Sequence, residues 1–277
     1  MIGEALLAAA PTGKSTPLRS KMAVALFGLL AAALTNLAQA ADMTVEGVKA
    51  VLGRASASAP ADLSGRDLSD LDLSGLDFRH ARLQGASFFG SKLVRTDFRG
   101  ASLVGANLNG SWLMGTDFTG ADLTRASLLS VVVLGGEVKK MPIFRNANMT
   151  GVRMIADLPG ADLSGADFSR SMVGVNIKNQ GMGQMRTDMS NARLTNATLA
   201  GADFNRSLMT FCDLRGSNLQ GANFFRVKLG GADLTGADVT DADFTEADLS
   251  GTIFRGVKGF DKAKGLDRAE NVDKIVR

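Results

Sequence analysis

Along most of the chain, a large apolar residue returns at every fifth position. In residues 231–251, GADLTGADVTDADFTEADLSG, these residues are Leu234, Val239, Phe244 and Leu249, and a small residue stands two places before each. A step of five fits neither the 3.6-residue turn of an α-helix nor the two-residue alternation of a strand. The pattern therefore indicates a backbone that turns a corner once in every five residues.

The five-residue pattern runs in two long blocks. Every fifth residue is apolar from Leu63 to Ile143, and again from Met189 to Phe254. Asp or Asn often precedes the large residue and Gly often follows two places after it, and these residue types favour turns. Nearly all residues two places before the large one are small. The exceptions stand at the ends of the first block and are Arg66, Leu71, Leu76 and Met141.

A chain that corners at a regular interval winds into coils, and stacked coils bury their apolar residues against neighbouring coils. The sequence therefore predicts an all-β fold, a β-solenoid whose interior holds the large apolar residues. The core residues that we expect include Leu63, Phe78, Phe98, Phe118, Phe204, Phe224 and Phe244.

Several five-residue segments point to a family. Ala-Asp-Leu-Ser-Gly occurs at 61–65 and 161–165, Ala-Asp-Leu-Thr-Gly at 232–236 and Ala-Asn-Leu-Asn-Gly at 106–110. The chain resembles the pentapeptide-repeat family, whose pattern is A(D/N)LXX, over most of residues 61–256, and in its export signal it resembles a bacterial member. The resemblance implies a right-handed quadrilateral β-helix with four repeats, or twenty residues, in each coil. It implies little about activity.

The segments outside the repeats suggest how the helix is bounded. Residues 41–60 are expected to form a cap helix at 44–53 and a linker, and the β-helix is expected to occupy 61–256. Residues 257–277 leave the repeat and are predicted to form a second, helix-like cap, because open solenoid ends expose a core and unpaired strand edges. The frame slips twice, which we interpret as a one-residue bulge near 144–148 and a loop at 174–186.

The first forty residues have the features of a secretory signal peptide. Arg19 and Lys21 precede the apolar run 22–34, and Ala38-Gln39-Ala40 forms a small-x-small cleavage site. An uncleaved anchor is the alternative, but thirteen apolar residues fall short of the roughly 20 that span a bilayer. We expect cleavage after Ala40 and a periplasmic or secreted protein, with either Met1 or Met22 as the start. The full chain has a net charge of +3, and residues 1–40 carry three basic residues and one acidic residue, which leaves +1.

If each coil has twenty residues, positions twenty apart stack on one face. One outward column is acidic and contains Asp77, Asp97, Asp117 and Glu137. The column beside it contains Arg79, Arg99, Thr119 and Lys139. Two interpretations are open: a stripe that binds a cation or a partner, or a structural ladder in which aspartates hold the corners and basic residues neutralise them.

The second block bears on this choice. Phe204, Phe224 and Phe244 are expected to repeat the aromatic column of Phe78, Phe98 and Phe118. Asp203, Asn223 and Asp243 stand beside these later phenylalanines, as aspartates stand beside the earlier ones. This repetition favours the structural interpretation.

A neighbouring face carries apolar residues at outward positions. The candidate interaction patch consists of Phe89, Val94, Trp112, Met114, Leu129, Val132 and Leu134. Apolar patches of a few hundred Å² usually contact something. The patch is covered by the 174–186 loop or the N-terminal helix, or it binds another protein or a second copy of the chain, or the assumed register is wrong.

The sequence offers no catalytic constellation. His80 is the single histidine and Cys212 the single cysteine, and Cys212 falls in a small inward slot. The carboxylates occupy the turn position of the repeat, so their number does not indicate acid-base chemistry. We find no phosphate-binding loop and no cysteine or histidine metal cluster. We therefore expect no enzyme activity, no cofactor and no metal site.

These observations favour an exported, non-catalytic scaffold that binds a protein partner through flat faces. The alternatives are a topoisomerase-protecting protein that imitates DNA, a secreted effector, a structural envelope component and an enzyme. A DNA mimic requires a strongly acidic rod in the cytoplasm, which the near-neutral charge and the export signal oppose. We expect no nucleic-acid partner and no stable membrane insertion after signal cleavage, and a homo-oligomer is possible.

Overall fold

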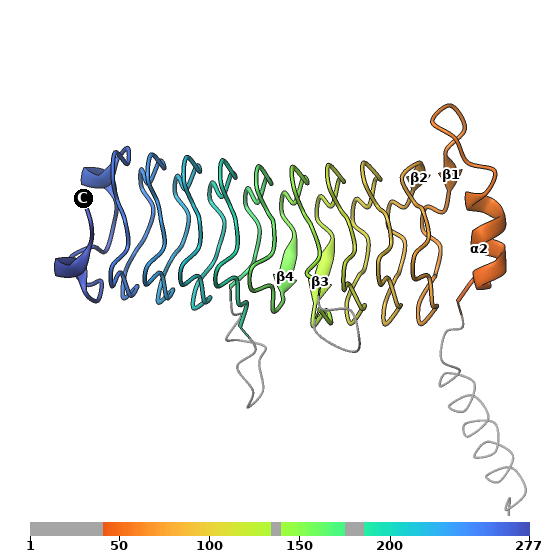
Figure 1. Cartoon of the computed structure of the whole chain (residues 1–277), viewed down its shortest axis with the longest axis horizontal. Helices are drawn as coiled ribbons and strands as arrows, with labels where there is room; N and C mark the ends of the chain where they lie inside the picture. The colour runs from red at the N-terminus through yellow and green to blue at the C-terminus, as the bar shows by residue number, and fades with distance from the viewer. Residues whose placement is uncertain (1–40, 134–139, 175–185) are drawn as a thin grey trace, which may run out of the picture. The chain divides into compact units, whose positions relative to one another are not determined.

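The computed structural model describes residues 41–133, 140–174 and 186–277. Residues 41–277 form one compact unit of stacked coils (Figure 1). Its elements, in chain order, are α2 (Val45–Leu52), β1 (Ala61–Asp62), β2 (Ala81–Arg82), β3 (Ser127–Leu129), β4 (Arg153–Ile155), and the 3₁₀ turns η2 (Phe260–Lys262) and η3 (Val272–Lys274). The predicted signal peptide lies outside the described residues.

Adjacent coils pair in parallel, usually twenty residues apart. β1 pairs with β2 through Ala61 and Ala81, and single bridges continue this pairing along four ladders. We name the four faces after the inward residues of the first coil: the Leu63, Leu68, Leu73 and Phe78 faces. The ladder on the Phe78 face passes through nine coils, at Asp77, Asp97, Asp117, Ile143, Asp162, Arg193, Asp213, Asp233 and Ile253. The fold is therefore a β-helix in which each coil contacts its neighbours on four faces.

The interior is a stack of fully buried side chains. All seven phenylalanines and leucines that we expected in the core are at most 1% exposed. The rings of Phe78, Phe98, Phe118 and Phe144 stack with centroid separations of 4.9, 5.2 and 5.1 Å in successive coils. Because every ring lies between two others, each coil depends on its neighbours for its apolar contacts.

The small inward slots hold alanine or a residue that satisfies its own polar group. The hydroxyl of Thr116 donates to the carbonyl of Leu93 at 2.7 Å, in the preceding coil. The thiol of Cys212 does the same with the carbonyl of Met189 at 2.9 Å. Burial raises the pKa of the Cys212 thiol to about 12. This cysteine is therefore a packed core residue.

Aspartates hold the corners. In most repeats, an Asp or Asn oxygen accepts the backbone N–H two residues later, as Asp233 Oδ1 does from Thr235 at 2.9 Å. These Asx turns bend the chain where the repeat requires a corner. The corner itself often needs a left-handed residue, such as Gly236 with φ of 70°.

The first frame slip differs from the bulge that we expected near 144–148. Asp117 pairs with Ile143, 26 residues later, so six extra residues enter between Val133 and Ile143. Ile143 consequently stands at the outward position, and Phe144 fills the core. The frame returns through a step of four residues, because Arg153 pairs with Met172 and Asp157 with Asp188.

The second slip adds eleven residues. Met172 pairs with Asp203, 31 residues later, and the predicted loop at 174–186 falls mostly on residues outside the described part. The two insertions also overturn one expectation about the aromatic columns. Phe204 lies in the ladder of the Leu68 face, opposite Phe78, because the extra residues shift all later repeats onto other faces.

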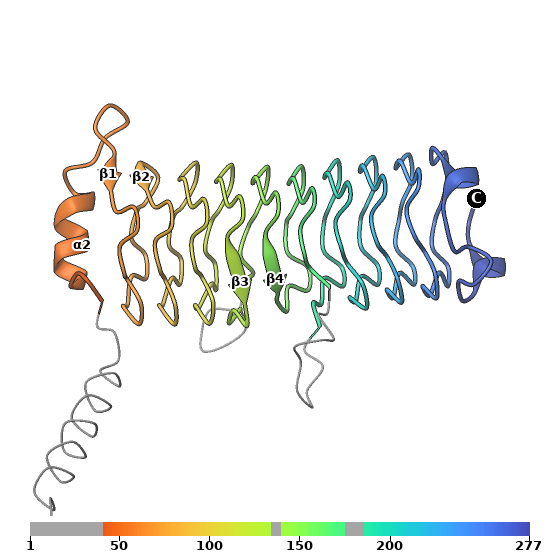
Figure 2. The same ribbon diagram turned by 180° about the vertical axis from the view of Figure 1, so that it is seen from behind.

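Both ends of the stack are covered (Figures 1 and 2). α2 starts after Thr44, whose Oγ1 accepts the N–H of Gly47 at 3.1 Å, and its Val48 is fully buried. Leu71 and Leu76 are larger than the usual slot residue because the first coil has no preceding coil to pack on. The C-terminal residues continue the ladders through Val276 and form 3₁₀ turns, so the expectation of a helix-like cap is corrected to an irregular tenth turn.

The stacked core predicts a sharp difference between adjacent phenylalanines. Phe224→Ala removes a buried ring between Phe204 and Phe244 and should lower the free energy of unfolding by about 3–5 kcal/mol. Phe225→Ala, which removes an outward ring, should cost about 1 kcal/mol or less. Urea denaturation of the two variants measures the difference, and equal losses would contradict the assigned register.

The buried thiol gives a chemical test. Cys212 should react very slowly with a thiol reagent in the folded protein, and the rate should stay low between pH 7 and 9, because a pKa of about 12 leaves almost no thiolate. In guanidinium, the same cysteine should react quickly and faster at higher pH. Rapid labelling of the folded chain would show that this coil opens or is packed differently.

Candidate interaction surface

The Leu73 face carries the central residues of the predicted patch. Trp112 and Val132 follow Lys92 in its bridge ladder, at a position that Asp or Asn occupies in most repeats. Trp112 is 39% exposed and Val132 is half-buried. This face therefore presents part of an indole ring and an adjoining aliphatic side chain to solvent.

The second column of the same face is less accessible than expected. Val94 is half-buried, and Met114 is only 3% exposed although its position in the repeat is an outward one. The N–H of Gly115, the next residue, donates to the carbonyl of Lys140 at 2.6 Å. Met114 thus belongs to the packed part of the molecule. Leu134, the next member of the column, lies outside the described residues.

Two predicted residues lie on the adjacent Leu68 face. Phe89 is 52% exposed, and Leu129 is half-buried in β3, where its N–H donates to Asn109 Oδ1 at 2.9 Å. The predicted patch is therefore divided between two faces that share a corner, with Trp112 and Phe89 as its most exposed aromatic residues.

Three apolar residues escaped the sequence reading. Met172 on the Leu68 face and Phe211 at a corner after the Leu73 face are strongly exposed, and Leu208 stands in the Leu73 ladder. Each departs from the repeat, since Met172 and Leu208 replace the turn-forming Asp or Asn and Phe211 replaces a corner glycine. That departure is the signal that could have found them.

A depression of roughly 490 Å³ lies where the Leu68 and Leu73 faces meet. It combines apolar side chains with two aspartates and an arginine. Its lining consists of Ser130, Val131, Ile155, Ala156, Asp157, Arg186, Asp188 and Leu208. The depression extends the apolar character of the Leu73 face beyond Trp112 and Val132.

Asp157 lacks the bond that most aspartates of the repeat make. The residue two places later is Pro159, which has no N–H to donate. Asp157 also stands beside Asp188 in the ladder. Burial and the negative charge of Asp188 both raise the pKa of Asp157. This pair of carboxylates, next to apolar side chains, favours a partner that supplies a cation.

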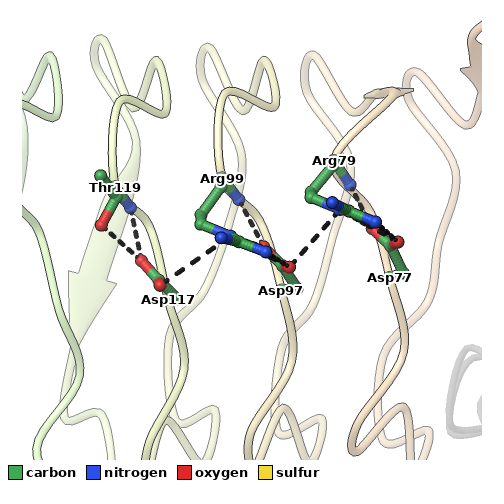
Figure 3. Close-up of polar contacts among 6 residues, drawn as sticks. All are labelled: Asp77, Arg79, Asp97, Arg99, Asp117 and Thr119. Carbon is green, nitrogen blue, oxygen red and sulfur yellow. Dashed lines mark hydrogen bonds and ion pairs between the residues drawn. The ribbon is translucent and has the colours of Figure 1, made fainter. Parts of the chain in front are cut away.

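The Phe78 face carries an ordered ion-pair ladder, shown in Figure 3. Arg79 Nη2 lies 2.6 Å from Asp77 Oδ2, and its Nε lies 3.5 Å from Asp97 Oδ2 in the next coil. Arg99 repeats this arrangement with Asp97 at 2.6 Å and Asp117 at 4.0 Å. The hydrogen bonds from Arg79 lower the pKa of Asp77 to about 2. Each arginine thus neutralises its own aspartate and the one that follows.

The ladder leaves little capacity for a cation. Its aspartates accept backbone N–H groups and arginine side chains at once, for example Asp97 from Arg99. Exposed pairs of this kind stabilise a fold only slightly. Beyond Asp117, Ile143 and Arg145 take the places expected for Glu137 and Lys139, which lie outside the described residues. The geometry agrees with the structural interpretation of the stripe.

The described residues contain no cluster suited to reaction chemistry. No group of three or more His, Cys, Asp or Glu side chains there is placed to hold a metal ion. His80 is exposed beside Lys49 and Asp77, in a depression of about 310 Å³ at the edge of α2. Within the same described part, no helix is long and apolar enough to cross a membrane.

Several proteins of known structure are similar to this chain. HetL of the cyanobacterium Nostoc sp. strain PCC 7120, involved in heterocyst differentiation regulation, is 24% identical, with 85% of this chain and 100% of HetL covered and a TM-score of 0.43. A pentapeptide repeat protein of the Arabidopsis thaliana thylakoid lumen is 34% identical over 40% of this chain and 66% of its own, with a TM-score of 0.24. QnrB1, a plasmid-mediated fluoroquinolone resistance protein, is 22% identical over 71% and 90%, with a TM-score of 0.30. No curated protein matches the chain.

The family model described as pentapeptide repeats matches this chain in eight copies. The matched segments are 61–93, 81–120, 91–128, 187–224 and 222–258. Residues 129–186, which contain both insertions and the four-residue step, fall between the matches. With parallel pairing every twenty residues and Asx turns at its corners, this chain belongs to the pentapeptide-repeat family.

Proposed function

We propose that this protein is a non-catalytic scaffold that binds a protein partner through the Leu73 face. One observation carries the proposal: Trp112 and Val132 replace turn-forming residues in consecutive coils and leave apolar surface accessible. The repeat does not need a tryptophan at this position. Tryptophan is among the residues that contribute most to protein interfaces.

The surroundings of Trp112 resemble an interface in composition. Lys92 precedes Trp112 in the ladder, and the acidic pair Asp157 and Asp188 follows Val132. An apolar centre with charged residues at its edge is typical of protein-binding surfaces. A partner segment with a large apolar side chain and a neighbouring Lys or Arg fits this order.

Two alternatives have less support. Coverage by the N-terminal helix does not fit, because α2 packs on the first coil and Trp112 of the third coil stays exposed. A DNA mimic requires strong negative charge, whereas the Phe78 face alternates Asp with Arg and residues 41–277 carry a net charge of +1. The 174–186 loop falls mostly outside the described residues.

We further propose that the scaffold is exported to the periplasm or beyond. The proposal rests on the basic residues, the apolar run and the Ala38-Gln39-Ala40 motif within residues 1–40. A secreted effector would share these features, so the location of the mature protein separates the two roles.

The partner surface predicts that two substitutions act differently. Trp112→Ser should reduce partner capture in a cross-linking pull-down at least tenfold, while changing the free energy of unfolding by less than about 1 kcal/mol. Met114→Ser, at a buried position, should cost about 2–3 kcal/mol of stability. Met172→Ser, on the Leu68 face, is the matched exposed control and should retain the partner. Normal capture by a folded Trp112→Ser variant would refute the proposed surface.

Export predicts a defined N-terminus. Protein isolated from the envelope or culture medium of its own cells should begin at Ala41, as measured by intact mass and N-terminal peptide sequencing. A chain that remains in the cytoplasmic fraction with residues 22–40 attached would contradict export. Replacing Ala38 and Ala40 with bulky residues should block cleavage and leave the longer form.

A further inference from the structure

A second surface feature lies at the corner between the Leu63 and Leu68 faces. Arg125 and Arg170 occupy left-handed corner positions, with φ of 58° and 56°, and Gly151 occupies the same position in the coil between them. Glycine fills most such corners without steric cost, whereas a longer residue is strained there. The corner itself therefore gives no reason for an arginine in either coil.

The two arginines border a depression of roughly 550 Å³. The missing side chain of Gly151 keeps its centre open, because a Cβ there would lie 3.6 Å from Cγ of Arg125. The remaining lining is polar and neutral. The lining residues are Thr124, Arg125, Asn148, Thr150, Gly151 and Arg170.

The local charge is not neutralised by ion pairs in the described part of the chain. Arg125 and Arg170 have no carboxylate within 4.0 Å there, in contrast to Arg79 and Arg99 of the ion-pair ladder. Arg153, on the adjoining Leu68 face two residues after Gly151, is also exposed and makes no ion pair among these residues.

The nearest acids in the ladder of the Leu63 face are already engaged. Asp122 accepts the N–H and the hydroxyl of Thr124, and Asp167 accepts the N–H of Ser169 at 2.8 Å. Asn148 stands between these two aspartates in the ladder, so the middle of the depression has an amide where its neighbours have carboxylates. Its Oδ1 accepts the N–H of Thr150, which leaves the amide N–H₂ as a donor.

We propose that this corner binds the phosphate ester group of an anionic ligand, with Arg125 and Arg170 holding it from two sides and Asn148 and Thr150 as neutral donors. Guanidinium groups match the oxygens of phosphate in paired hydrogen bonds. The phosphate belongs either to a lipid headgroup or to a soluble phosphorylated molecule. This site lies on a different corner from Trp112 and does not depend on the proposed partner surface.

Left-handed arginines allow a test in which folding is preserved. Arg125→Gly and Arg170→Gly place the residue that the conformation prefers, so thermal stability should be unchanged or higher. Arg95→Gly is the matched control, because Arg95 has φ of 57° at a different corner and loses the same charge. All three variants are made in the full chain.

Binding is measured in 50 mM salt with two probes. Isothermal titration with pyrophosphate reports a soluble ligand, and co-sedimentation with phosphatidylglycerol vesicles, against phosphatidylcholine vesicles, reports a lipid headgroup. For at least one probe, Arg125→Gly and Arg170→Gly should each weaken binding tenfold or more, and Arg95→Gly should change it less than twofold. The proposal is overturned if the unaltered protein binds neither probe, or if Arg95→Gly weakens binding as much as the other two.

Discussion

The structure depends on the stacking of like side chains in successive coils. Phe98 lies between Phe78 and Phe118, and Phe224 lies between Phe204 and Phe244, so each buried ring is enclosed by the coil before and the coil after. A single coil cannot exclude water from its own interior. Parallel pairing of the backbone fixes the coil spacing, and the apolar column supplies the burial that keeps the coils together.

This constraint explains which parts of the fold could be predicted from the sequence. A corner every five residues requires a large residue inside, a small one two places before it and an Asx turn between them, and residues such as Ala232, Asp233 and Leu234 show all three. The position of an insertion is not determined in this way. Ile143 fits the five-residue pattern as well as Phe144 does, and only the pairing of Asp117 with Ile143 shows that the outer position is the correct one.

The candidate surfaces were harder to predict because they depend on register and on exposure. Trp112 was recognised because the first three coils have regular twenty-residue spacing. Met114 was expected to be accessible but is buried, and Met172 was missed because it follows the first insertion. In each proposed site, the informative residue breaks the repeat: an indole replaces a turn-forming carboxylate at Trp112, and a guanidinium replaces a hydrogen atom at Arg125.

The eleven extra residues between Met172 and Asp188 have a consequence for how such a chain can change in evolution. Because any repeat can pair with any other through its backbone, gain or loss of one five-residue unit would leave the core continuous while moving every later side chain to the adjacent wall. Gain or loss of four units would lengthen or shorten the rod and leave its surface pattern in place. Small changes in length can therefore redistribute surface groups around this protein without any point substitution.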